Sequence, residues 1–332
     1  MQRRKSLLLT VLLFFILGAA FLWAEGIKET KLDKAVSRMG VLGETNTTVT
    51  FREYSGNIVE IPKEPKRTIV SLNSIMDVWY MAGGESLARA NGSISVPEEA
   101  ADIPLLGRFV QLNTELMMKL EPDLLIVSEN QHQLEIRDFF AEEGVPGVAI
   151  KYNTYDDFRV ILDLFTRLTG NRELYKEKLL PYQRQIQSIV DQVPEGEAPT
   201  VCILFSSTKY VKVETQNSVT GDYCAKLGAE NIYKETTFEG ATRVALSLEY
   251  ILEQDPDIIF VTTMGDVEKC RARIDKDITS SDIWGDLTAV KNNRFIYLDK
   301  SFSLYKPNRA YPKAFKTMAE YLYPDIEFTL TE

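Results

Sequence analysis

A pattern that occurs twice constrains this chain more than any other feature of its sequence. It runs from Asn113 to Ser128 and again from Ser247 to Thr262. In each copy a helix-capping residue stands two positions before a glutamate and a short apolar helix follows. An acid-Pro-Asp sequence then ends the helix, and four apolar residues predict a strand. Two matching units so far apart predict two lobes of similar build, with the functional site between them.

The amino terminus has the pattern of a signal peptide. Three cations at positions 3–5 precede an uncharged, mostly apolar run over 6–24. We place the cleavage after Ala24, with Ala20 as the alternative. An uncleaved membrane anchor is the competing interpretation, because a run of this length just spans a bilayer. No cysteine lies near the run, so a lipid anchor has no acceptor, and we expect a soluble product in the periplasm.

The charge and the cysteines exclude several classes of protein. The net charge is −10, and removing the leader's cations makes it more negative, so nucleic acid is not an expected partner. The three cysteines, Cys202, Cys224 and Cys270, are too few and too scattered for a disulfide framework, and their pairing stays open. We expect Cys202 to be buried, because it lies in an apolar strand.

Strand and helix patterns alternate twice along the chain and predict an α/β fold. It consists of two parallel-sheet lobes joined by a long helical linker, with the ligand cleft between the lobes. The linker is assigned because 156–168 and 172–192 are helical in pattern, with no strand signal near them. The predicted divisions are a signal peptide at 1–24, a flexible leader at 25–47, lobes at 48–154 and 194–332, and the linker at 155–193.

Motifs of many enzyme families are missing from the sequence. There is no phosphate-binding Gly-rich loop, nucleophile elbow, His-Glu-x-x-His pair or Cys-x-x-Cys. The only histidine is His132, which excludes a multi-histidine metal site. We therefore predict no catalytic residues, no resident metal and no cofactor.

Five segments in the correct order carry a resemblance to a known family. They are Pro65–Leu72, Glu115–Asp123, Leu227–Ile232, Ser247–Asp257 and Trp284–Leu298. On these segments the chain resembles the periplasmic substrate-binding proteins of ABC importers, in the helix-linked class that serves ferric siderophores, haem, cobalamin and some oxyanions. One departure is the segment 305–308, Tyr-Lys-Pro-Asn, which we associate with only part of that family.

The resemblance implies a role for the glutamate in each repeated unit. In this family a glutamate on each lobe pairs with arginines of the membrane permease, and Glu115 and Glu249 match those positions. An acid in the first turn of a helix is also stabilised by the helix dipole, by about 0.3–1 kcal/mol, wherever it occurs. The same register in both copies favours docking onto an inner-membrane ABC permease.

Candidate ligand-binding residues follow the predicted strand ends. Arg108 and Arg243 are candidates to bind an anionic ligand through charge-assisted hydrogen bonds. His132 and Tyr152 are candidates to ligate iron or haem directly, although a single loop histidine is more often only solvated. The remaining candidates are Asn73, Phe109, Met264 and Tyr305.

These observations lead to one main hypothesis and several alternatives. The main hypothesis is a monomeric, non-catalytic exported receptor that binds an iron-containing chelate, a ferric siderophore or haem, and delivers it to an ABC permease. The same role for cobalamin or for molybdate or tungstate is the first alternative. A two-lobed metal-cofactor enzyme such as a chelatase, and a ligand-gated sensor, are alternatives of other classes.

Overall fold

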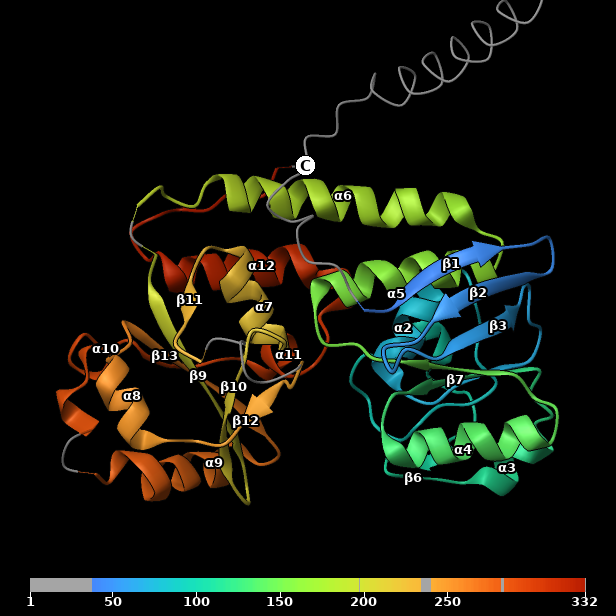
Figure 1. The fold of residues 1–332 in the computed structure, drawn as a ribbon, viewed down its shortest axis with the longest axis horizontal. Coiled ribbons are helices and arrows are strands. Elements are labelled where there is room, and N and C mark those ends of the chain that lie inside the picture. The colour runs from blue at the N-terminus through green and yellow to red at the C-terminus, as the bar shows by residue number, and fades with distance from the viewer. Residues whose placement is uncertain (1–37, 197, 234–239, 282–283, 332) are drawn as a thin grey trace, which may run out of the picture. The chain divides into compact units, whose positions relative to one another are not determined.

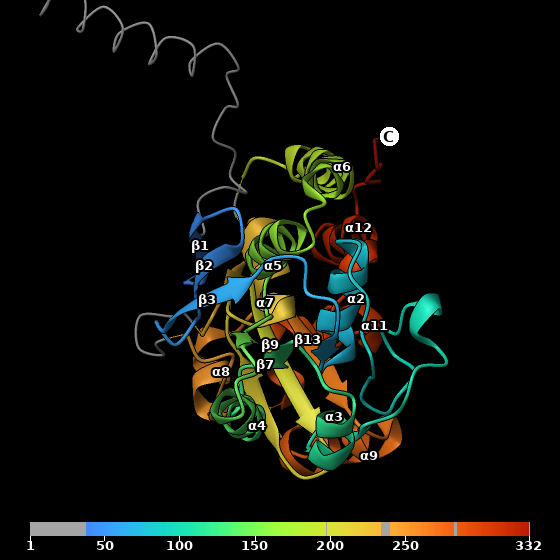
Figure 2. The same cartoon turned by 90° about the vertical axis from the view of Figure 1, so that its right-hand side faces the viewer.

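The computed structural model describes residues 38–196, 198–233, 240–281 and 284–331. The predicted signal peptide at 1–24 and the start of the segment 25–47 lie outside these residues. Both lobes belong to one compact unit, and Figures 1 and 2 show it from two sides. No helix in the described ranges is both long enough and apolar enough to cross a membrane.

The first lobe is built on a three-stranded parallel sheet in the order β4-β7-β8. Leu124–Val127 of β7 are fully buried, as expected for a strand covered on both faces. Its core is a hydrophobic cluster that includes Met117 of α3 and Phe140 of α4. The elements of this lobe are β4 (Thr68–Val70), α2 (Asn73–Met81), η2 (Glu98–Ala100), β5 (Gly107–Arg108), β6 (Gln111–Leu112), α3 (Thr114–Lys119), β7 (Leu124–Ser128), α4 (Gln131–Glu142) and β8 (Gly147–Ile150).

An antiparallel sheet of β1 (Gly40–Glu44), β2 (Thr48–Arg52) and β3 (Ile58–Pro62) precedes this lobe. Strands β2 and β3 pair as a hairpin, and the prediction of a flexible leader through residue 47 is wrong at β1. This strand lies at the edge of the sheet and is mostly exposed, so its sequence shows no apolar alternation. Pairing with β2 and ion pairs from Glu44 to Lys63 and Arg167 hold it in place.

The second lobe contains a mixed sheet in the order β12-β10-β9-β13-β14, with β11 beside β9. Strands β9, β11, β13 and β14 are parallel, as predicted, whereas β10 and β12 join antiparallel. The antiparallel pairing of β10 follows from the short turn after β9, which can only reverse the chain. The strands are β9 (Thr200–Ser207), β10 (Val211–Glu214), β11 (Glu230–Asn231), β12 (Arg243–Val244), β13 (Ile258–Met264) and β14 (Phe295–Tyr297).

Short helices surround this second sheet and enclose a core that includes Cys202, Ile259 and Trp284. They are α7 (Val219–Lys226), α8 (Leu248–Gln254), α9 (Val267–Ile274), η4 (Asp275–Thr279), η5 (Trp284–Asp286), α10 (Thr288–Lys291), α11 (Lys300–Ser303), η6 (Asn308–Ala310) and α12 (Tyr311–Leu322). Cys202 is fully buried, as predicted, and Cys224 and Cys270 are also buried free thiols.

The two predicted helices between the lobes are confirmed as α5 (Tyr155–Leu168) and α6 (Arg172–Asp191). Helix α5 leads the chain out of the first lobe, but it also packs against α2, β1 and β2 and so covers part of that lobe. Helix α6 packs on both α5 and α12, lying across the two lobes in Figure 1. The connection between the lobes is therefore a packed helix with neighbours on each side.

The repeated unit has the same geometry in both lobes. Asn113 and Ser247 accept hydrogen bonds from the third residue after them and cap α3 and α8. The residue before proline has a left-handed backbone in both copies, with φ of 45° at Glu121 and 41° at Asp255.

The aspartate of each unit explains why the acid-Pro-Asp sequence is repeated. Asp123 accepts from the backbone amides of Lys66 and Arg67 at 2.7 and 2.9 Å. Asp257 accepts from the amide and the hydroxyl of Thr200, both at 2.7 Å. The separation from Lys66 to Asp123 equals that from Thr200 to Asp257, 57 residues. Each aspartate thus fixes the start of the first parallel strand of its lobe, β4 or β9. That strand lies beside the strand that follows the repeated helix, β7 or β13.

Candidate functional site

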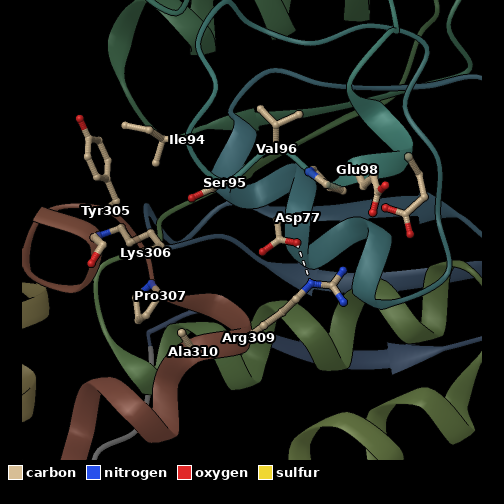
Figure 3. Close-up of a pocket in the computed structure, with 13 residues that line it drawn as sticks. Asp77, Ile94, Ser95, Val96, Glu98, Tyr305, Lys306, Pro307, Arg309 and Ala310 are labelled. Carbon is tan, nitrogen blue, oxygen red and sulfur yellow. Dashed lines mark hydrogen bonds and ion pairs between the residues drawn. The ribbon is translucent and has the colours of Figure 1, made fainter. Parts of the chain in front are cut away.

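A pocket of about 670 Å³ lies between the two lobes. Its volume is typical of small-molecule sites. Figure 3 shows its walls, which come from Asp77 of α2, the loop 94–99, Ser301, the segment 305–307, Arg309 and Ala310. Ile94, Val96 and Pro307 contribute apolar surface, while the carboxylates and the guanidinium contribute charge. The pocket therefore offers apolar walls together with ionic groups of both signs.

Asn308, between the pocket residues Pro307 and Arg309, joins the lobes. Its amide nitrogen donates to the Ser74 carbonyl at 2.9 Å and to Asp77 Oδ2 at 2.8 Å. The other Asp77 oxygen accepts from Arg309 Nε at 3.1 Å, the contact drawn in Figure 3. Asn308 has a left-handed φ of 46°, which asparagine tolerates better than most residues. These bonds tie α2 of the first lobe to the segment that precedes α12.

Tyr152 lies buried on the other side of Asn308. Its hydroxyl donates to Asn308 Oδ1 at 2.6 Å, and burial raises the pKa of Tyr152 well above its usual range. The phenol is therefore neutral and already hydrogen-bonded in this structure. Direct ligation of iron by Tyr152, one of the roles considered from the sequence, would require that bond to break.

Arg243 is paired within its own lobe. Its Nε and Nη2 lie 3.0 Å from Glu214 Oε1, across the antiparallel register of β10 and β12. Its guanidinium lies 3.6 Å from the centre of the Phe205 ring. Burial raises the pKa of Glu214, although Arg243 acts in the opposite direction. Much of the donor capacity of Arg243 is therefore already used.

Lys306 reaches from the pocket wall to the Tyr152 ring. Its Nζ lies 5.4 Å from the ring centre. Burial lowers the pKa of Lys306 to about 8, against the opposing influence of Asp157 and Glu214. Within the described part of the chain, it makes no hydrogen bond and no ion pair.

The other predicted ligand-binding residues lie at several places. Tyr305 lines the pocket, next to Lys306. Asn73 begins α2 and is buried, and its Oδ1 has no hydrogen-bond partner among the described residues. Phe109 packs on the first lobe's core, and its carbonyl accepts from Gln133.

Arg108, His132 and Met264 are exposed and do not line this pocket. Arg108 lies on β5, His132 in the first turn of α4 and Met264 at the end of β13. Their roles as ligand-binding residues stay predictions. No group of three His, Cys, Asp or Glu side chains in the described ranges is arranged to hold a metal ion.

The ligand-binding residues predicted from the sequence did not include Asp77, Lys306, Arg309 or the loop 94–99. Two signals were present in the sequence. Asp77 interrupts the otherwise apolar run of α2, and Lys306 and Asn308 belong to the segment that departs from the family pattern. The loop 94–99 carries no motif, and only the structure brings it opposite the segment 305–310 (Figure 3).

The two repeated glutamates are exposed and equivalent in position. Glu115 lies in the first turn of α3 and Glu249 in the first turn of α8. Neither forms an ion pair with another described residue. Both carboxylates are free to meet a basic partner.

Comparison with known proteins gives three findings. A family model described as periplasmic binding protein matches residues 69–302. The High-affinity heme uptake system protein IsdE of Staphylococcus aureus is 24% identical over 210 residues, covering 62% of this chain and 70% of the relative. Crystal structures of an ABC transporter substrate-binding protein from Listeria monocytogenes and of S. aureus IsdE complexed with heme share the fold.

The two structural matches differ little in quality. The Listeria protein has a TM-score of 0.68 at 22% identity, covering 79% of this chain and 100% of its own. IsdE has a TM-score of 0.67 at 20% identity, covering 77% of this chain and 98% of its own. The two-lobed fold and the family resemblance predicted from the sequence are therefore confirmed. Since the family model spans well over half of the sequence, the chain belongs to the periplasmic binding protein family and is a solute-binding protein of the ABC-transporter type, not an enzyme.

Proposed function

We propose that this protein is an exported receptor that binds an iron-containing chelate, a ferric siderophore or haem, between its lobes and delivers it to an ABC permease. The pocket that both lobes build around Asp77, Tyr305 and Lys306 carries this proposal. A relative whose name describes high-affinity heme uptake supports the ligand class.

The chemistry of the pocket suits such a chelate. Ile94, Val96 and the Tyr305 ring provide surface for an apolar ring system or ligand backbone. Lys306 and Arg309 provide cations for carboxylate groups. A ligand that is apolar over most of its surface and anionic at one edge would satisfy both kinds of wall.

Export and docking complete the proposal. The leader at 1–24 directs the chain to the periplasm, where the mature protein acts as a monomer without a lipid anchor. Glu115 and Glu249 are the contacts with the permease, one from each lobe. Their exposure and their equal positions on α3 and α8 support this role.

The ligand class is tested by direct binding. Native mass spectrometry and absorption spectra of the purified protein are recorded with ferric citrate, other ferric siderophores, haem, cobalamin and molybdate. We expect one-to-one binding of an iron chelate, weakened about tenfold by Tyr305→Ala because an aromatic wall is lost. The matched control is Phe139→Ala, which removes an exposed ring on α4 and should leave binding unchanged. Binding of cobalamin or molybdate alone, or of none of the panel, would contradict the proposal.

A further inference from the structure

Lys306 is a charged group enclosed between the lobes without a hydrogen-bond partner. Its side chain is half-buried, and its ammonium lies 5.4 Å from the centre of the Tyr152 ring. Buried ammonium groups are normally paired, because an unpaired one loses its hydration without compensation. A partly buried cation that reaches from the wall of a ligand pocket and lacks a partner among the described residues is therefore a site to which an anion would bind favourably.

The acids around Lys306 are already engaged elsewhere. The charged groups that influence it are Asp157 of α5, Glu214 of β10, Asp222 of α7 and Arg243 of β12. Asp157 accepts from the backbone amides of Asn153 and Thr154 at 2.9 and 3.1 Å. No ion pair within 4 Å joins any of these carboxylates to Lys306 in the described structure.

Glu214 and Asp222 have partners of their own. Glu214 accepts from Arg243, and Asp222 accepts from the Tyr155 amide at 2.8 Å and lies 3.6 Å from the Lys226 ammonium. Within the described residues the donors of Lys306 are thus uncommitted, whereas Arg243, one of the two cations favoured by the sequence, is paired.

We propose that Lys306 holds a carboxylate of the ligand, so that the receptor selects chelates with a free carboxylate over neutral ones. The inference rests on the proposed receptor function, because it assumes that the ligand binds between the lobes. A haem propionate and the carboxylate of a citrate-type siderophore present the same chemistry to an ammonium group.

The proposal has a pH signature with a definite sign. A carboxylate beside Lys306 favours the protonated amine and raises the pKa of Lys306 above its ligand-free value of about 8. Binding therefore takes up a proton when the pH exceeds that value, and affinity for a carboxylate ligand should fall as the pH rises from 7 to 9.5. Asp157, Asp222, Glu214 and Arg243 are the other ionisable groups that influence Lys306. The Lys306→Met variant retains all four, so it shows any pH dependence that comes from them.

The experiment compares three variants with the wild type. Lys306→Met removes the charge, Lys306→Arg keeps it, and Lys313→Met makes the same change on the exposed face of α12. Quenching of tryptophan fluorescence reports the binding of haem, haem dimethyl ester and ferric citrate at pH 7 and 9.5. We expect Lys306→Met to lose at least tenfold affinity for haem or ferric citrate, while Lys306→Arg and Lys313→Met stay near the wild type. The dimethyl ester should not distinguish the variants, and the pH dependence should vanish in Lys306→Met.

The other possible results also decide whether Lys306 binds a carboxylate of the ligand. Equal affinity of Lys306→Met and Lys313→Met for every carboxylate ligand would overturn the proposal while leaving the receptor function intact. A lower thermal midpoint of Lys306→Met with unchanged affinity would assign Lys306 a structural role instead. If the wild type binds no iron chelate, the proposed function fails, and metal-free citrate tests Lys306 alone. Citrate binding that Lys306→Met abolishes supports the carboxylate assignment, and absence of citrate binding overturns it.

Discussion

At the scale of single residues, burial controls the charge of Asp222 at the joint between the lobes. Its carboxylate accepts from the amide of Tyr155, the first residue of α5, at 2.8 Å. Lys226 lies on α7, the helix that also carries Asp222. Its ammonium is 3.6 Å from the Asp222 carboxylate and also pairs with Asp156 at 2.7 Å. Burial raises the pKa of Asp222 to about 7, with Lys226 acting in the opposite direction. The carboxyl group is therefore partly protonated near neutral pH.

This shift predicts how stability depends on pH. The folded pKa lies above the unfolded value of about 3.9, so the folded state binds more protons between these values. The contribution of Asp222 is fully present below the unfolded pKa and is lost as the pH rises through 7. The free energy of unfolding, measured with urea, should therefore decline between pH 4 and 8, in part because of Asp222. We expect Asp222→Asn to remove that part of the decline.

Asp286→Asn is the control, because this aspartate is exposed and should retain the wild-type decline. Equal pH profiles for Asp222→Asn and the wild type would show that the carboxyl group titrates alike in the folded and unfolded states.

At the scale of elements, the repeated unit divides into a structural part and an exposed part. Asp123 and Asp257 bond to the start of β4 and β9, which explains the acid-Pro-Asp sequence without any reference to a partner. Glu115 and Glu249 make no comparable contact and lie exposed on α3 and α8. The same motif therefore contains one residue that folding requires and one that is available for docking.

The double variant Glu115→Ala with Glu249→Ala tests the docking role. We expect ligand affinity and thermal stability close to the wild type, since both side chains are exposed and a first-turn acid contributes only about 0.3–1 kcal/mol to its helix. Uptake of the labelled ligand by cells carrying the cognate permease should be lost. The control pair is Glu142→Ala with Glu268→Ala, two exposed acids outside both the repeat and the pocket lining. Uptake at the normal rate in the repeat variant would refute docking through these residues.

At the scale of the whole molecule, several contacts limit relative motion of the lobes. Helix α6 packs on α5 and α12 together. Asn308 adds bonds to Tyr152, Ser74 and Asp77 across the lobes. A site held in this way is largely formed before the ligand arrives, so less free energy is spent on ordering it.

We therefore expect only a small change in size when ligand binds. Small-angle X-ray scattering with and without a saturating bound chelate should give radii of gyration that differ by less than about 1 Å. The Asn308→Ala variant, which loses the inter-lobe bonds, should show a larger change. A clear contraction of the wild type on binding would show that the lobes close like a hinge.

The sequence determined those features that depend on neighbours along the chain. Capping residues, proline stops and apolar runs are local signals, and they predicted the repeated units, helices α5 and α6, and the alternation of strands and helices. They missed β1 because an exposed edge strand carries no apolar alternation, and its partner β2 supplies its structure. The same local signals selected Tyr305 at the pocket.

Only the tertiary structure decided which charges are paired and which are available. Whether Arg243 is committed depends on Glu214, 29 residues away. Whether Asp77 is satisfied depends on Asn308, 231 residues away. No periodicity or motif encodes such pairs, because they arise only when strand pairing within a lobe, or contact between the lobes, brings distant residues together. For this reason the sequence favoured Arg108 and Arg243 for anion binding, while among the described residues Lys306 lines the pocket without a hydrogen bond or an ion pair.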